Sequence, residues 1–223
     1  MADWVTISSL ATAGGTLALA VTTYASVRSA NRAARVAELS LRAGLLPLLV
    51  ESGDSDDTLR VNFYEIHGIA VPGGRAAVEI IDDNVYLVVS LRNVGNGIAV
   101  LHGGRVWPGR QGAGADPPPL DSFRLLSRDI YVPAGTIGFW QTAFRDDSAD
   151  ERQLLLPGIE AGYLMVDVLY SDFEGGQRTI SRYGVGREDD GAWHTSAVRH
   201  WQVDRAEPRA RGSTVAPGEA VST

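Results

Sequence analysis

The chain has 223 residues, enough for one domain with appendages and for a core that needs no disulfide or metal staple. It contains no cysteine, which excludes thiolate catalysis, cysteine-ligated zinc, iron–sulfur clusters and a disulfide framework. All 20 basic residues are arginines: residues 1–45 hold four against two acidic residues, whereas the rest holds 16 against 25, an acidic balance that argues against nucleic-acid binding.

Residues 4–27 form a segment of 24 residues without a charged side chain. As an α-helix the segment is about 36 Å long, which exceeds the ~30 Å hydrocarbon layer of a membrane. Trp4 and Tyr24 lie near its ends, where amphipathic rings favour the headgroups. Its serine and threonine hydroxyls can bond back to the helix backbone. We therefore predict a single transmembrane helix that contacts membrane lipid.

Two other interpretations of this segment stay open. Ala18-Leu19-Ala20 resembles a signal-peptide cleavage site, although Asp3 and the absence of a preceding basic residue disfavour one. A buried or surface helix of a soluble protein is the other. If the segment spans the membrane, the positive-inside rule places the N-terminus outside and the remainder in the cytoplasm. The arginines behind this orientation are Arg28, Arg32, Arg35 and Arg42.

Residues 28–44 are rich in helix formers and predict a basic stalk that continues the helix until Gly44 and Pro47. We expect residues 1–45 to be transmembrane helix and stalk, 46–203 to be a β-sandwich, and 204–223 to be a disordered tail.

From residue 46 the apolar pattern changes to a period of two, which predicts eight or nine strands separated by turns. No helical pattern of 10–15 residues alternates with them, so the pattern favours an antiparallel, immunoglobulin-like sandwich over βαβ units. Residues 67–84 and 108–120 are expected to be irregular, and 145–160 to hold a helical turn. The predicted strands are 46–51, 59–66, 85–93, 98–107, 129–132, 136–144, 162–171, 177–183 and 193–203.

Four segments resemble an uncharacterised family of small bacterial proteins with one N-terminal transmembrane helix, a basic stalk and an immunoglobulin-like sandwich. The segments are Leu45-Leu46-Pro47 after the arginines, Leu91–Ala99, Val132–Gly135 and Tyr170–Gly175. The resemblance, with the N-terminal helix included, covers about 70% of the chain. An arginine commonly precedes the proline of the first segment, where this chain has Leu46. The resemblance implies a fold and an anchor and no known activity.

Two of these segments supply candidate turn residues. Asn93, Gly95, Asn96 and Gly97 stand between two strands, and Asn-Gly is the preferred pair of a type I′ hairpin turn. Asp172 and Gly175 stand in a second hairpin, where the carboxylate is expected to accept backbone N–H bonds. We interpret all six as structural.

The sequence supplies no catalytic, cofactor-binding or metal-binding residue that we can assign. It has no G-x-S-x-G, H-E-x-x-H or Walker A motif, and His194 and His200 would lie about 20 Å apart on one strand. We therefore expect a non-catalytic, membrane-anchored interaction or scaffold module for an unidentified protein partner. The alternative is an exported ligand- or carbohydrate-binding sandwich, in which paired aspartates in loops bind calcium. An enzyme built on the sandwich is a third class.

Overall fold

The computed structural model describes residues 4–64, 66–109 and 116–205. The chain falls into two compact units that divide between Leu45 and Leu46. The predicted tail from residue 206 onward lies outside the described residues.

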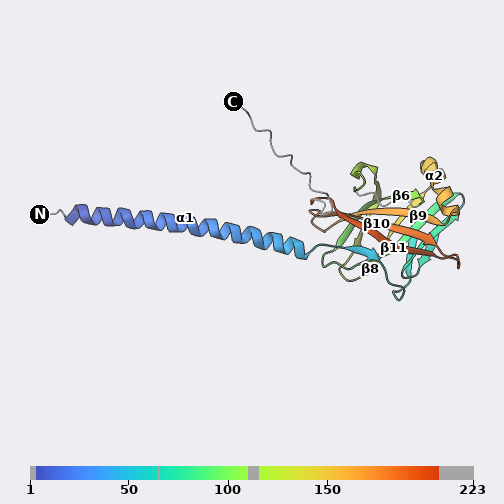
Figure 1. Cartoon of the computed structure of the whole chain (residues 1–223), viewed down its shortest axis with the longest axis horizontal. Helices are drawn as coiled ribbons and strands as arrows, with labels where there is room; N and C mark the ends of the chain where they lie inside the picture. The colour runs from blue at the N-terminus through green and yellow to red at the C-terminus, as the bar shows by residue number, and fades with distance from the viewer. Residues whose placement is uncertain (1–3, 65, 110–115, 206–223) are drawn as a thin grey trace, which may run out of the picture. The chain divides into compact units, whose positions relative to one another are not determined.

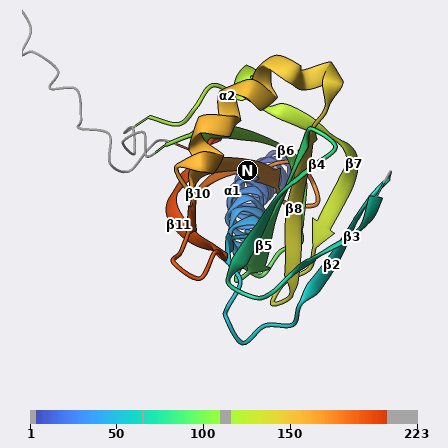
Figure 2. The same ribbon diagram turned by 90° about the vertical axis from the view of Figure 1, so that its right-hand side faces the viewer.

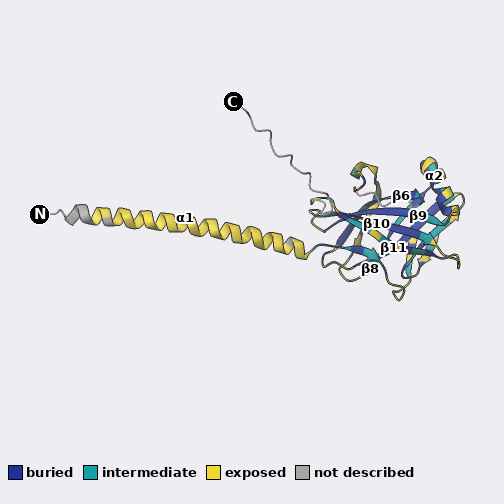
Figure 3. Cartoon of the chain, viewed as in Figure 1, coloured by how far each residue is buried: buried dark blue, intermediate teal, exposed yellow. Residues whose placement is uncertain are grey.

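The first unit is one continuous helix, α1 (Trp4–Gly44), of 41 residues (Figure 1). By length and composition it is able to cross a membrane. Its described side chains are exposed along its length (Figure 3), among them Leu17, Leu19 and Val21. Thr12, Thr16 and Thr22 donate hydroxyl bonds to the carbonyls four residues earlier, at 2.8–2.9 Å, as the sequence predicts.

The described residues of the second unit form eleven strands, one α-helix and two short 3₁₀ turns. They are β1 (Leu49–Glu51), β2 (Leu59–Phe63), β3 (Ile66–Val71), β4 (Arg75–Ile81), β5 (Asn84–Asn93), β6 (Ala99–Pro108), η1 (Leu120–Ser122), β7 (Arg124–Val132), β8 (Ile137–Phe144), η2 (Asp146–Ser148), α2 (Ala149–Glu160), β9 (Tyr163–Ser171), β10 (Arg178–Arg187) and β11 (Trp193–Gln202).

Nine of these strands join into one antiparallel sheet that curls around the core (Figure 2). Its path is β7–β6–β9–β10–β11–β4–β5–β8, and β1 pairs with the last three residues of β5. Strands β2 and β3 form a separate hairpin. The prediction of a mainly antiparallel β domain behind an N-terminal helix is therefore confirmed, and the immunoglobulin-like arrangement stays a prediction.

Alternation along the strands builds the core. Val85, Leu87, Val89 and Leu91 of β5 point into the main core, as their period of two predicted. The intervening Tyr86 and Val88 are buried as well, because the β2–β3 hairpin covers the outer face of β5. At one end of the sheet, Leu155 and Ile159 of α2 complete the main core. Burial on both faces makes β5 the central strand of the domain.

Several predicted boundaries are wrong; for example, the predicted strand 129–132 begins already at Arg124, and the predicted strand 177–183 extends to Arg187. Residues 67–84, expected to be irregular, contain β4 and most of β3, because the Pro-Gly-Gly run at 72–74 makes only a short turn between them. The predicted strand 59–66 is divided: β2 ends at Phe63, and Ile66 begins β3. Residues 145–160 hold the twelve-residue helix α2, longer than the expected turn. The predicted loop 108–120 lies partly outside the described residues.

Candidate interaction site

The two ends of the curled sheet, β7 and β8, adjoin without pairing. They are consecutive in the chain, yet β7 pairs with β6 and β8 pairs with β5, and no ladder joins the two in the described residues. They meet at their shared turn, where a Cβ added to Gly138 would lie only 2.5 Å from the Val132 side chain. Figure 2 shows the two strands diverging away from that turn. The sheet therefore has an open seam.

A groove of about 680 Å³ occupies this seam. Its walls are residues 124–128 of β7 and 140–143 of β8, and the β2 residues Asn62 and Phe63 with Tyr64 flank it. Neighbouring residues of a strand point to opposite faces, so a groove lined by consecutive residues follows the strand edges. Such edges carry backbone N–H and C=O groups without a partner strand. We call this groove the seam groove.

A bulge explains why β7 turns away from its neighbour. Ile130 pairs with Leu101 of β6 and Leu125 pairs with Gly103, so that residues 126–129 all stand opposite His102 alone. Extra residues on one strand bend it and increase its twist, and they interrupt the ladder locally. The bend directs this part of β7 away from a regular pairing geometry, and it coincides with the β7 wall of the seam groove.

Trp140 forms the inner side of the seam groove. Its indole is 1% exposed and lies against Gly104 of β6, the strand beyond β7. Its Nε1 and the side-chain oxygen of Gln141 are buried and lack a hydrogen-bond partner among the described residues. A second hollow of about 360 Å³ also borders Trp140 and shares Arg124 and Thr142 with the seam groove. Buried polar atoms without a partner are rare in folded proteins.

We expect Gly104→Ala to destabilise the domain by about 1–3 kcal/mol, because the new methyl would lie 2.1 Å from the Trp140 ring. Urea unfolding of the full chain checks this. A matched control is Gly176→Ala, where nothing lies within 4 Å of the added Cβ. Trp140→Leu should relieve the clash, so the double variant should lose less than the two single losses combined. Strict additivity would contradict the contact.

The charges around the seam groove are mainly positive. Arg124, Arg128 and Arg145 line it together with one carboxylate, Asp147. Arg124 makes long contacts, 3.5 Å to Glu151 and 3.9 Å to Asp147, and its side chain is 38% exposed. Such exposed ion pairs contribute little to the stability of a fold. The groove also presents exposed apolar surface from Tyr64 and Leu125, which are 100% and 72% exposed.

The candidate turn residues lie at the other end of the domain. The Asn93 side chain is fully buried and uses its whole capacity: Nδ2 donates to the carbonyls of Gly97 and Val132, and Oδ1 accepts the N–H groups of Leu48 and Gly95. Gly95 is required for a close approach, because a Cβ there would lie 2.3 Å from the Leu46 oxygen. This amide ties β5 to the chain before β1 and to the end of β7.

The prediction of a type I′ turn at Asn96-Gly97 is wrong. Neither residue has a positive φ, and β5 and β6 do not pair with each other in the described residues. The chain instead crosses between two parts of the sheet, held by the Asn93 side chain. The two-residue turn with positive φ at both positions is Asp82-Asp83, at 48° and 63°, between β4 and β5. Aspartate tolerates this region better than most residues, so the turn could have been found from that signal.

Asp172 and Gly175 lie in the turn between β9 and β10. The Asp172 carboxylate accepts the Gly176 N–H at 2.8 Å and the Gln177 side-chain amide at 3.2 Å, and Gly175 has a φ of 74°. Tyr170, at the start of the same family-like segment, accepts the N–H of Leu49 through its hydroxyl. The segments that carry the family resemblance are therefore joined by hydrogen bonds around β1 and the end of β5.

Two serine–histidine contacts resemble parts of a catalytic site. The Ser181 hydroxyl lies 2.6 Å from Nδ1 of His200, and the Ser171 hydroxyl lies 2.8 Å from Nε2 of His102. Both serines are at most 1% exposed, so neither oxygen is accessible to a substrate. Ser181 also bonds the Tyr170 hydroxyl at 2.9 Å within the core. Burial raises the pKa of Tyr170. The geometry is that of a structural network.

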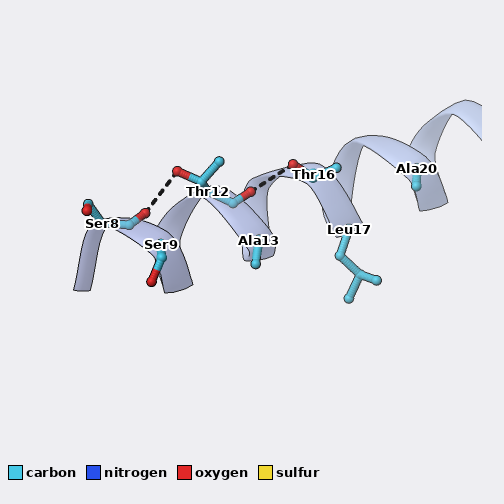
Figure 4. Close-up of a pocket in the computed structure, with 7 residues that line it drawn as sticks. All are labelled: Ser8, Ser9, Thr12, Ala13, Thr16, Leu17 and Ala20. Atoms are coloured by element: carbon cyan, nitrogen blue, oxygen red, sulfur yellow. Dashed lines mark hydrogen bonds between the residues drawn. The ribbon is translucent and has the colours of Figure 1, made fainter. Parts of the chain in front are cut away.

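The remaining candidates supply no site chemistry. Among the described residues no group of three or more histidine and acidic side chains is placed to hold a metal ion. His67 belongs to β3, but its side chain lies outside the described part. A shallow hollow follows one side of α1 from Ser8 to Ala20, where Figure 4 shows Thr12 and Thr16 bonding back along the helix. Their hydroxyls are thus used within the helix.

Sequence reasoning missed the seam groove, because it depends on which distant strands pair. One signal was present: Gly103-Gly104 inside an apolar strand indicates a bulge or a close backbone approach, and the structure has both there. Comparison with protein-family models and with curated proteins found no match to this chain.

Proposed function

We propose that this protein is a membrane-anchored interaction module that binds an extended segment of a partner protein as an added strand in the seam groove, and that it does not catalyse a reaction. The observation that carries the proposal is the pair of strand edges at residues 124–128 and 140–143 that line one groove without pairing. Addition of a strand to such edges is a common mode of peptide recognition.

The dimensions of the seam groove support an extended occupant. Each wall is four or five residues long, which is about 13–17 Å of strand. A strand placed there would bond both edges at once, since the walls belong to different ends of one sheet. Tyr64 and Leu125 would supply apolar contacts at the rim. Because no ladder crosses the seam in the described residues, binding there has no native pairing to displace.

The anchor belongs to the same proposal. Helix α1 supports it through its length and its exposed apolar side chains. The arginines that follow residue 27 favour an external N-terminus and a cytoplasmic β domain. The immunoglobulin-like sandwich of the resembling family is likewise part of the proposal, supported by the antiparallel, curled sheet.

A topology experiment tests the anchor. With a tag after Thr223, the full chain should sediment with membranes, and protease added to intact spheroplasts should leave the tag intact until lysis. Digestion before lysis would instead favour the exported, calcium-dependent ligand- or carbohydrate-binding module. A soluble tag would contradict the anchor altogether.

Site-specific photo-crosslinking in membranes tests the seam groove. A photoreactive residue at Leu125 of β7 and one at Thr142 of β8 should form adducts with the same short partner segment, because a bound strand touches both walls. The matched control is Val198 of β11, which is 41% exposed and does not line the seam groove. Adducts of equal yield from position 198, or different segments at the two walls, would overturn the proposal. The readout is peptide mapping of the adducts.

A further inference from the structure

We infer that the segment bound in the seam groove is acidic, carrying carboxylate side chains toward Arg124, Arg128 and Arg145; this inference rests on the function proposed above. Three guanidinium groups and one carboxylate line the groove. The residues from 46 onward hold 16 arginines and 25 acidic residues, so their net charge is negative. The groove therefore has the opposite sign of charge to the domain that contains it. Charge complementarity of this kind selects partners and speeds their encounter.

The three guanidinium groups have different surroundings. Arg128 has no ion-pair partner among the described residues and lies on the β7 wall, exposed to solvent. Arg124 holds its two acidic neighbours only at 3.5 Å and 3.9 Å. Arg145 lies over the Tyr86 ring, 5.9 Å from its centroid, at the end of β8. A carboxylate in the groove would gain a planar, two-pronged donor from each arginine that it reaches.

The arginines are spread along the groove, which favours an extended ligand over a single small anion. Arg124 stands before the bulge opposite His102 and Arg128 stands within it, whereas Arg145 follows β8 on the other side of the groove. Alternate side chains of a bound strand point the same way at about 7 Å intervals, so different acidic side chains of one segment approach arginines on both walls. The expected motif therefore has acidic residues at alternating positions, separated by residues that face the apolar rim.

The backbone fixes how such a segment pairs. Strands β7 and β8 are consecutive and run in opposite directions, so one strand between them pairs parallel with one wall and antiparallel with the other. On the β8 wall the Gln141 side-chain oxygen is buried and has no hydrogen-bond partner among the described residues. Backbone bonds supply affinity without sequence preference, and the arginines supply the preference for acid.

The test uses the full chain in mild detergent and three fluorescent peptides of equal length that alternate valine with glutamate, glutamine or arginine. Anisotropy should show the glutamate peptide binding at least about tenfold more tightly than the glutamine peptide, and the arginine peptide not at all. Added salt should reduce the difference in affinity between the glutamate and the glutamine peptide, because salt screens the charges at the rim of the groove. Methylating alternate backbone amides of the glutamate peptide should abolish its binding.

Charge-reversal variants localise the effect. Arg128→Glu should lower the affinity for the glutamate peptide by about tenfold or more. Arg60→Glu is the matched control, since Arg60 is exposed on β2 outside the seam groove, and it should change the affinity by less than about twofold. Both side chains are exposed, so neither change should unfold the domain. An equal loss in the two variants would show attraction to the whole surface and overturn the inference.

Amide hydrogen exchange separates this inference from the proposed function. If the glutamine and glutamate peptides protect the amides of residues 124–128 and 140–143 equally, strand addition stands and the acidic preference is wrong. If no peptide protects these amides, the proposed function fails with it. Protection that appears without peptide, on raising the protein concentration, would assign the seam groove to a second copy of the chain and overturn both.

Discussion

Replacing Asn93 by leucine should lower the free energy of unfolding by roughly 3–5 kcal/mol. Leucine is similar in size but removes all four bonds of the amide, leaving two partly buried N–H groups and two buried carbonyls without this partner. Each unsatisfied buried group costs about 1–3 kcal/mol, and local relaxation recovers part of the sum. The measurement is urea unfolding of the full chain in mild detergent, followed by tryptophan fluorescence of the β domain.

Asn96→Leu is the control for this prediction. Asn96 lies three residues away in the same loop, is exposed, and uses its backbone N–H to bond the Leu46 oxygen, which leucine keeps. Asn96→Leu should change the free energy of unfolding by no more than about 0.5 kcal/mol. If Asn93→Leu cost no more than Asn96→Leu, the Asn93 side chain would not hold β1, the loop and β7 together.

Replacing Arg182 by methionine should cost about 3–5 kcal/mol, because it leaves a buried carboxylate without its partner. Arg182 donates to Asp167 through Nε at 2.8 Å and Nη2 at 3.0 Å, and both side chains are at most 7% exposed. The guanidinium also lies between two indole rings, 4.8 Å from the centroids of Trp107 and Trp201. The double variant that combines Asp167→Leu with Arg182→Met removes both charges and should recover most of the loss.

The stability lost in Arg182→Met should increase as the pH rises. Burial raises the pKa of Asp167, and removal of Arg182, which lowers it, will raise it further. The folded variant then binds a proton more tightly than the unfolded chain, so its stability falls as pH rises above the unfolded value near 3.8. The difference in free energy of unfolding between the unmodified protein and the Arg182→Met variant should be smaller near pH 4 than near pH 8. A deficit independent of pH would show that lost packing on the indoles, and not the carboxylate, is the cause.

Arg178→Met provides the comparison, because its pair with Asp204 lies at the surface. Arg178 is 43% exposed and reaches Asp204 at 2.6 Å. Exposed pairs contribute about 0–1 kcal/mol, so this variant should lose much less than Arg182→Met. A similar loss at both positions would contradict the assignment of the effect to burial.

The parts of the fold that could be predicted are those that local patterns decide. Alternation alone places Val85, Leu87 and Val89 on one face of β5, and an uncharged run followed by arginines among helix formers gives the course of α1 to Gly44. These features depend on side-chain period and on helix propensity, which are properties of neighbouring residues.

The seam groove could not be predicted, because it depends on non-local pairing. β8 pairs with β5 and β7 with β6, although β7 and β8 are joined by a short turn of the kind that connects the strands of hairpins. The type I′ prediction at Asn96-Gly97 failed for the same reason, since Asn93 decides the path of that loop through contacts up to 45 residues away. Burial of both faces of β5 likewise follows from the distant β2–β3 hairpin.

The most direct test of the open seam is residue-resolved amide hydrogen exchange of the free full-length chain. Strand β8 pairs with β5 along one edge only, so alternate amides within residues 140–143 should exchange rapidly while the others are protected, and residues 126–128 of β7 should exchange rapidly as well. The central strands β5, β9 and β10 serve as the protected reference. Uniform protection of residues 124–128 and 140–143, equal to that of β9, would mean that the seam is closed, and the proposal of strand addition between β7 and β8 would be wrong.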